Sequence, residues 1–184
     1  MLKYLYQGIT FQEVPCEISM VFYLLGCPRH CEDCHSRHFW DISIDDSIGQ
    51  AFTLYSLRNI IKLNWHDYEN CSTLLFMGGD WEEEEFLNVI EGIAIKSAYD
   101  EKLNTHKKNL AWYTGSHYNE LKYPRLFTKY FDYLKFGPYV KELGGLNNPK
   151  TNQVYLYKQW KCANDLFHSN GEEKHEHVCE SIIT

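Results

Sequence analysis

The chain has 184 residues, of which 44% are hydrophobic and 16% aromatic, and its 18 basic and 25 acidic residues give a formal charge of −7. This length and composition suit one domain with a substantial core and exclude two full catalytic domains, and the scattered basic residues predict no direct nucleic-acid binding. No apolar run approaches the roughly 20 residues that cross a bilayer, and residues 1–20 lack a secretory signal, so we expect a cytoplasmic protein without membrane contact.

The first clear strand signal comes directly before a group of cysteines. Residues 20–25 (MVFYLL) form a short apolar run that stops at Gly26, which is typical of a buried strand feeding a loop. The cysteines therefore begin where a strand ends. Beyond them, Thr53 can cap a helix that ends near Trp65. The apolar residues on one face of this helix are Leu54, Leu57, Ile60 and Ile61.

A second strand and helix follow. Residues 73–77 (TLLFM) form an apolar run that is ended by two glycines. Asp80 then precedes Glu83 by three residues, a spacing similar to a capping box, which predicts the start of a helix. The acidic run at residues 82–85 falls in the first turn, where the helix dipole favours carboxylates, so we assign it no chemistry. The core-facing residues of this helix are Phe86, Leu87, Ile90 and Ile93.

Two more strands complete a repeating pattern. Residues 110–114 (LAWYT) end at Gly115, and residues 131–136 end at Gly137. Strands, glycine turns and helices in alternation predict a parallel sheet with crossover helices, in which ligands bind at the carboxyl ends of the strands. About five or six strand signals are too few to close an eight-stranded barrel. We therefore predict an α/β fold built as an open, partial barrel.

The domain organisation is simple. No internal repeat or linker divides residues 1–160, so we predict one domain over residues 1–163. Residues 164–184 are polar and rich in Glu and His, which predicts a tail or a short appendage. The tail residues that can bind a soft divalent metal, but that we expect to be solvated, are His168, His175, His177 and Cys179.

Three of the seven cysteines lie within eight residues, in the segment 26–41 (GCPRHCEDCHSRHFWD). Cys27, Cys31 and Cys34 follow the pattern C-x3-C-x2-C. In a reducing compartment such clustering favours metal ligation over disulfides. A compact loop of this length can wrap three thiolates around one cubane 4Fe–4S cluster and leave the fourth iron without a protein ligand. An open position of this kind is typical of catalytic metal sites.

A zinc knuckle is the alternative reading of the same cysteines. A neighbouring histidine would then complete the site. Zinc sites more often use two C-x2-C pairs, and this chain has no second pair, which favours the cluster. The candidate histidines are His30, His35 and His38.

Four segments together carry a family resemblance. The first is residues 11–40 (FQEVPCEISMVFYLLGCPRHCEDCHSRHFW), and it is followed by FMGGD at 76–80, WYTG at 112–115 and the stretch 132–157. In this order they resemble the radical SAM superfamily, and the first segment is similar to activating enzymes of anaerobic (class III) ribonucleotide reductases. The later segments resemble the family's glycine-rich motif, its third-strand motif and its carboxy-terminal signature. The likeness extends over roughly residues 5–160.

The resemblance implies a radical-SAM-type partial β/α barrel and a function as an activase. In such enzymes S-adenosylmethionine (SAM) chelates the open iron, a reductant such as flavodoxin or ferredoxin supplies an electron, and a 5′-deoxyadenosyl radical forms. That radical would take hydrogen from a glycine of the partner, a glycyl radical enzyme that we expect to be an anaerobic ribonucleotide reductase. The implied SAM-binding residues are Asp33, His35, Gly78, Gly79, Asp80, Thr114 and Gly115.

Some details depart from the family pattern. Asp33 stands where a small or aromatic residue is usual, Trp81 stands where Pro is usual, and Cys16 occupies a position that is often acidic. The three motif cysteines and both glycines are present. Two other functions stay open at this point: a radical SAM enzyme that acts on a small molecule, such as a modified-nucleoside precursor, and a cluster or zinc binding module without SAM turnover.

Overall fold

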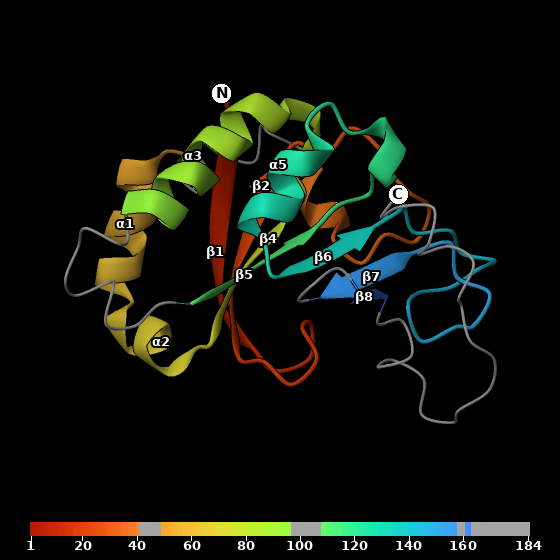
Figure 1. The fold of residues 1–184 in the computed structure, drawn as a ribbon, viewed down its shortest axis with the longest axis horizontal. Coiled ribbons are helices and arrows are strands. Elements are labelled where there is room, and N and C mark those ends of the chain that lie inside the picture. The colour runs from red at the N-terminus through yellow and green to blue at the C-terminus, as the bar shows by residue number, and fades with distance from the viewer. Residues whose placement is uncertain (41–48, 97–107, 158–160, 163–184) are drawn as a thin grey trace.

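The computed structural model describes residues 1–40, 49–96, 108–157 and 161–162, and its strands form one sheet (Figure 1). The strand order is β3-β1-β2-β4-β5-β6-β7-β8. Within the described ranges the two outer strands, β3 and β8, do not pair with each other, so the sheet is open, as predicted. The strands are β1 (Lys3–Thr10), β2 (Ser19–Leu25), β3 (Gln50–Ala51), β4 (Thr73–Met77), β5 (Asn109–Tyr113), β6 (Tyr133–Phe136), β7 (Val154–Tyr157) and β8 (Lys161–Cys162).

The strand directions divide the sheet into a parallel centre and antiparallel edges. β2, β4, β5 and β6 run parallel, whereas β1 pairs antiparallel with β2 and β3, and β7 pairs antiparallel with β6 and β8. The prediction of parallel strands is therefore right for the centre and wrong for the edges. Only residues 11–18 join β1 to β2, and parallel neighbours need a crossover of about a dozen residues or more.

The helices cover one face of the sheet (Figure 1). In the parallel centre the helix-side residues Phe22, Phe76, Trp112 and Leu134 are neighbours in register and belong to the larger core. Alternation along the strands places Val21, Leu75, Ala111 and Tyr133 in a second cluster on the other face. No described α-helix contributes to that second cluster. The helices are α1 (Leu54–Leu63), α2 (Trp65–Asn70), α3 (Glu83–Lys96) and α5 (Pro124–Tyr130).

Local sequence signals account for most of these elements. The strand predictions for residues 20–25 and 73–77 are confirmed by β2 and β4, and those for 110–114 and 131–136 agree with β5 and β6 within two residues. Thr53 caps α1 as predicted, because its hydroxyl accepts a hydrogen bond from the backbone N–H of Ser56 over 3.1 Å. The predicted core faces of α1 and α3 are also confirmed, since their apolar residues pack in the larger core cluster.

The start of α3 differs from the prediction. A 3-10 turn, η2 (Asp80–Glu82), precedes the helix, and its N-cap is Gly79. No side-chain hydrogen bond caps this turn, so the predicted capping role of Asp80 is wrong. The reason is that the Asp80 carboxylate is bound by other side chains, which are described with the site below.

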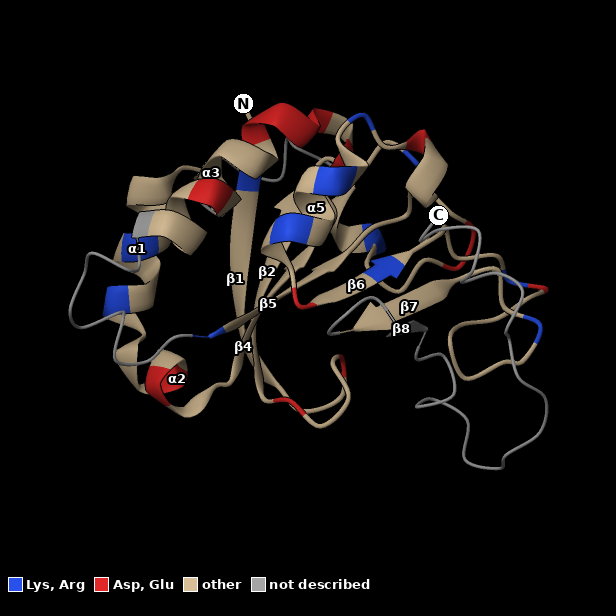
Figure 2. Cartoon of the chain, in the orientation of Figure 1, with Lys and Arg blue, Asp and Glu red and all other residues tan. Residues whose placement is uncertain are grey.

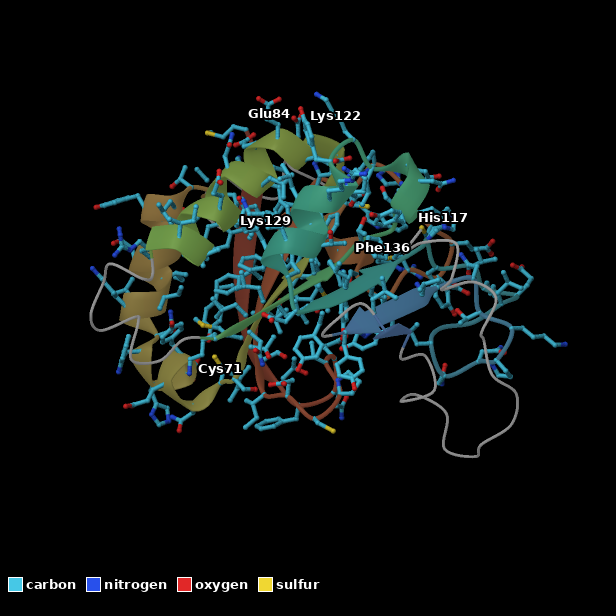
Figure 3. All side chains as sticks on the ribbon, in the orientation of Figure 1. Cys71, Glu84, His117, Lys122, Lys129 and Phe136 are labelled. Carbon is cyan, nitrogen blue, oxygen red and sulfur yellow. The ribbon has the colours of Figure 1, made fainter. Side chains whose placement is uncertain are left out.

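The acidic run at residues 82–85 holds neighbouring segments in place. Its last three residues form the first turn of α3, as predicted. The Glu83 carboxylate accepts hydrogen bonds from the backbone N–H groups of Lys122 at 2.9 Å and Tyr123 at 3.0 Å. Figure 2 shows the acidic start of α3 and the basic residues of α5 on the outside of the helical layer, and Figure 3 shows Glu84 and Lys122 close together there.

Most of the bulky aromatic side chains fill the core. Trp112 stacks on Phe127 with ring centres 3.9 Å apart, and Phe86 stacks on both Trp112 and Phe131. The fully buried aromatic residues include Tyr4, Phe22, Phe52, Phe76, Phe86, Trp112, Phe127, Phe136 and Tyr155. The aromatic content of the sequence is thus used chiefly in packing.

Two predictions about the ends and the environment of the chain remain. Residues 164–184, with the tail histidines and Cys179, lie outside the described residues. None of the described helices combines the length and the apolar character that a membrane crossing requires.

Candidate functional site

The cysteine loop leaves β2 at Gly26 and turns back on itself. Gly26 has a φ of 91°, in the left-handed region that favours glycine. Its backbone N–H donates to the carbonyl of Phe39 over 2.8 Å, which closes the loop at its base. Within the loop His30 and Asp33 also have positive φ, 45° and 56°. These reversals keep the three motif cysteines in one compact segment.

A cavity of about 280 Å³ lies beside this loop, and Cys27, Cys31 and Cys34 all line it. Much of its remaining wall comes from the carboxyl ends of the four parallel strands, where ligands of α/β sheets usually bind. Glu13, Tyr139 and Gln153 also line it. The structure therefore places the cysteine motif at the predicted edge of the sheet. Residues in the wall at the ends of β2, β4, β5 and β6 include Leu24, Gly78, Thr114 and Gly137.

The chemistry of the three thiols suits an iron–sulfur cluster. All three are free, and thiolates are the usual protein ligands of 4Fe–4S clusters. In the part of the chain that the structure describes, no three His, Cys, Asp or Glu side chains gather closely enough to hold a single metal ion. All three cysteines nevertheless border the same cavity. His30 stacks on Trp40 at 4.7 Å, and of the three candidate zinc ligands only His35 lines the cavity.

The sulfurs of the loop differ in their surroundings. Burial raises the pKa of the Cys27 thiol, and a hydrogen bond from the backbone of Arg29 opposes that rise. The backbone N–H of Ser36 donates to Cys34 Sγ over 3.4 Å. Metal binding must therefore displace a proton from Cys27 that burial holds there.

Arg29 anchors the cysteine loop to the ends of two strands. Its guanidinium lies 3.4 Å from the carboxylate of Asp80 through Nε, and its Nη2 donates to Ser116 Oγ at 2.6 Å and Glu120 Oε2 at 3.1 Å. The Ser116 hydroxyl donates in turn to Asp80 over 2.7 Å. The Asp80 side chain is only 5% exposed, so the positive charge and the hydroxyl compensate a carboxylate that is largely removed from water.

The position of the Arg29 side chain explains why residue 115 is a glycine. A Cβ atom at this position would lie 2.7 Å from Cδ of Arg29, too close for a real contact. The glycine thus allows the arginine to cross the end of β5. Sequence reasoning missed Arg29, because a basic residue inside a cysteine loop carries no sign of distant partners.

The two glycines after β4 face different neighbours. Gly78 lines the cavity; its N–H donates to the carbonyl of Tyr113, and its carbonyl accepts from the indole N–H of Trp112, each at 2.8 Å. A carbonyl oxygen has two lone pairs, so one remains after the indole bond. Gly79 is not among the lining residues, and a Cβ there would meet the ring of Phe86 at 3.0 Å.

Of the remaining predicted site residues, some line the cavity and others do not. His35, Thr114 and Gly115 line the cavity, although the Thr114 hydroxyl already accepts the N–H of Ser116 at 2.9 Å. Asp33 is not among the lining residues. Its carboxylate lies 2.7 Å from Nζ of Lys141, which lowers its pKa and ties the loop to the segment after β6.

Lys135 is a second cavity residue that sequence reasoning missed. It lies in β6 and lines the cavity together with the three cysteines. Its ammonium stands 4.9 Å from the ring centre of Tyr113. A charged residue within the otherwise apolar strand YLKF is the signal from which it could have been found.

Comparison with known proteins agrees with this chemistry. The family model described as 4Fe-4S single cluster domain matches residues 17–155, which include the three motif cysteines and all four parallel strands. Searches of curated proteins and of solved structures found no match. The family match covers most of the 184 residues. The chain is therefore an iron–sulfur protein that belongs to the 4Fe-4S single cluster domain family.

Proposed function

We propose that this protein is a radical SAM activase that generates a glycyl radical on an anaerobic ribonucleotide reductase. The observation that carries the proposal is the shared cavity, in which the C-x3-C-x2-C thiols face the carboxyl ends of four parallel strands. Cys27, Cys31 and Cys34 would hold the 4Fe–4S cluster. When bound and reduced, the cluster would supply the electron that breaks the S–C5′ bond of SAM, giving methionine and a 5′-deoxyadenosyl radical.

The chain's own groups would position SAM beside the cysteine loop. Gly78 lets the ligand approach the end of β4, and the free lone pair of its carbonyl can accept a hydrogen bond from the SAM ammonium. His35 and Gly115 form parts of the wall for the adenosyl group. The Arg29 and Asp80 pair would keep the first half of the loop fixed against β4 and β5.

A partner is proposed because the cavity is small for two ligands and lies at an edge of an open sheet. Its volume of about 280 Å³ is just below the range for ligand pockets, roughly 300–1,000 Å³. The second apolar cluster, which contains Tyr113 and Tyr133, has no α-helix from the described residues over it. The glycine-bearing loop of the reductase would complete the enclosure, and flavodoxin or ferredoxin would deliver the electron.

The test is reconstitution of the full chain with iron and sulfide without oxygen, followed by reduction and addition of SAM and the candidate reductase. We expect 5′-deoxyadenosine and an electron paramagnetic resonance signal of a glycyl radical in the reductase. The matched control is the reductase with its acceptor glycine changed to Ala, which should give no signal.

Two results would contradict the proposal in different ways. Formation of 5′-deoxyadenosine that depends on a small substrate, with no protein radical, would identify a radical SAM enzyme of another kind. A fully loaded protein that never cleaves SAM would be an iron–sulfur module without this activity.

A further inference from the structure

Lys135 is set among apolar residues by the register of the sheet. Its neighbours Leu134 and Phe136 point into the larger core with the helices, so alternation along β6 puts Lys135 on the opposite face. On that face it is paired with Tyr113 of β5 and Tyr155 of β7. A lysine at this position must direct its ammonium toward the cavity that the cysteine loop borders.

The ammonium of Lys135 has an aromatic contact but no ionic one among the described residues. It lies over the Tyr113 ring at 4.9 Å, and no described carboxylate forms an ion pair with it. Arg29, the other cation in the cavity wall, is by contrast neutralised by Asp80 and Glu120. Glu13 lines the same cavity and its negative charge acts on Lys135 without forming an ion pair with it, so the half-buried cation is only partly compensated. An anion that binds in the cavity would compensate it further.

The motif cysteines, which line the same cavity as Lys135, are a source of such an anion. Burial lowers the pKa of Lys135, and negative charge at Glu13 or Cys34 opposes that lowering, so the ammonium is within electrostatic reach of Cys34. A 4Fe–4S cluster held by three thiolates is a net anion, and it gains one further negative charge on reduction. Because opposite charges attract, a nearby cation stabilises the more negative reduced form more than the oxidised form.

We propose that Lys135 sets the redox potential of the cluster by supplying the positive charge that stabilises its one-electron-reduced state. No bond is made or broken in this role; the electron comes from an external reductant, and the ammonium keeps its proton. Lys135 is thus a tuning residue that acts through charge. The inference rests on the cluster alone and does not depend on the proposed reaction with SAM.

The test uses the full chain, reconstituted without oxygen and titrated with dithionite in the absence of SAM, with electron paramagnetic resonance as the readout. Lys135→Met should lower the equilibrium constant for reduction at least about tenfold, which is about 59 mV for a one-electron couple. The redox potential of Lys135→Arg should stay closer to that of the original protein, because arginine keeps the positive charge. The matched control is Lys129→Met, which removes an exposed lysine from α5, on the helix-covered side of the sheet (Figure 3).

Each outcome decides the proposal. A fully loaded Lys135→Met protein that titrates like the original, or an equal shift in Lys129→Met, overturns it. Lys135→Gln provides a second neutral variant; if both neutral variants fold but hold no cluster, Lys135 serves assembly and the tuning role is wrong. If the potential of Lys135→Met is unchanged and a separate titration with SAM shows weaker SAM binding, the ammonium is assigned to the SAM carboxylate, which also overturns the proposal. None of these measurements requires SAM cleavage, so the proposed function is tested separately.

Discussion

At the scale of single residues, the described cysteines fall into distinct environments. Cys27, Cys31 and Cys34 share one cavity, whereas Cys16 is exposed at the surface. Cys71 is buried near the opposite end of the sheet (Figure 3), where its thiol donates to the carbonyl of Tyr68 over 3.3 Å. A cysteine in such a site behaves as a small hydrophobic residue.

We predict that replacing any one of Cys27, Cys31 and Cys34 by Ala abolishes assembly of the 4Fe–4S cluster, because a site with three thiolates has none to spare. Cys16→Ala and Cys71→Ala should leave the cluster intact. Iron content and visible absorption after anoxic reconstitution measure this. A protein that loses its cluster with Cys16 but keeps it without Cys34 would show that the ligands are assigned wrongly.

Arg29 is expected to stabilise the fold even before a cluster binds. Arg29→Met leaves the nearly buried Asp80 carboxylate without its cation, and Ser116 becomes its remaining partner. We expect the free energy of unfolding to fall by about 1–3 kcal/mol in urea titrations of the apo protein. Arg125→Met, which changes an exposed residue of α5, is the control and should have an effect below about 0.5 kcal/mol. Equal effects of the two substitutions would argue against an anchoring role.

At the scale of elements, the turn between β4 and η2 depends on two left-handed glycines, with φ of 86° at Gly78 and 89° at Gly79. Their neighbours differ. Gly78 belongs to the cavity wall, whereas Gly79 packs against Phe86 of α3 and Leu24 of β2. The second glycine thus serves the junction between sheet and helix.

Gly79→Ala should therefore destabilise the fold more than backbone strain alone. The added Cβ would be 3.0 Å from the Phe86 ring and 3.2 Å from Leu24 Cγ. Gly8 provides the matched control, since its φ is 111° but a Cβ there meets nothing within 4 Å. We expect backbone strain to lower the free energy of unfolding of Gly8→Ala by about 1–2 kcal/mol. Overpacking should lower that of Gly79→Ala by about 1–3 kcal/mol more, as measured by urea unfolding. A smaller loss at Gly79 than at Gly8 would contradict this.

At the scale of the whole molecule, the parallel strands are joined at both ends. The cysteine loop and Arg29 connect them at the carboxyl ends, and Glu17 connects them at the amino ends. The Glu17 carboxylate accepts hydrogen bonds from Thr73 at 3.1 Å and Asn109 at 3.3 Å, and also from the hydroxyls of Ser72 and Tyr133. These donors lie at the starts of β4, β5 and β6, so one carboxylate links the amino ends of these three strands.

Removing that carboxylate should weaken the entire sheet. Glu17→Ala removes the acceptor of four hydrogen bonds. We expect a loss of roughly 2–4 kcal/mol in unfolding free energy, since hydrogen bonds to charged groups contribute about 1.5–3 kcal/mol each but are not additive. Glu17→Gln should lose less unfolding free energy than Glu17→Ala. Glu69→Ala, at an exposed position of α2, is the control. Unfolding of the Glu17→Ala protein at the original urea midpoint would show that these bonds add little.

The sequence by itself determined the elements whose signals are local. Apolar runs that end at glycine located β2 and β4, the Thr53 hydroxyl located the start of α1, and the cysteine spacing located the loop that borders the cavity. Each of these signals acts through neighbours a few residues away. The rule that parallel strands bind ligands at their carboxyl ends then placed the cavity on the correct edge.

Only the tertiary structure decided which side chains meet at that edge. The partners of Arg29 lie 51, 87 and 91 residues further along the chain, and they take Asp80 away from the capping role that its local spacing suggested. Lys135 reaches the cavity because strand register turns it away from the helices. Gly79 packs against core residues and not against the cavity, and the Asp33 carboxylate forms an ion pair with Lys141. Such contacts depend on how strands align after folding, and no local pattern in the chain specifies that alignment.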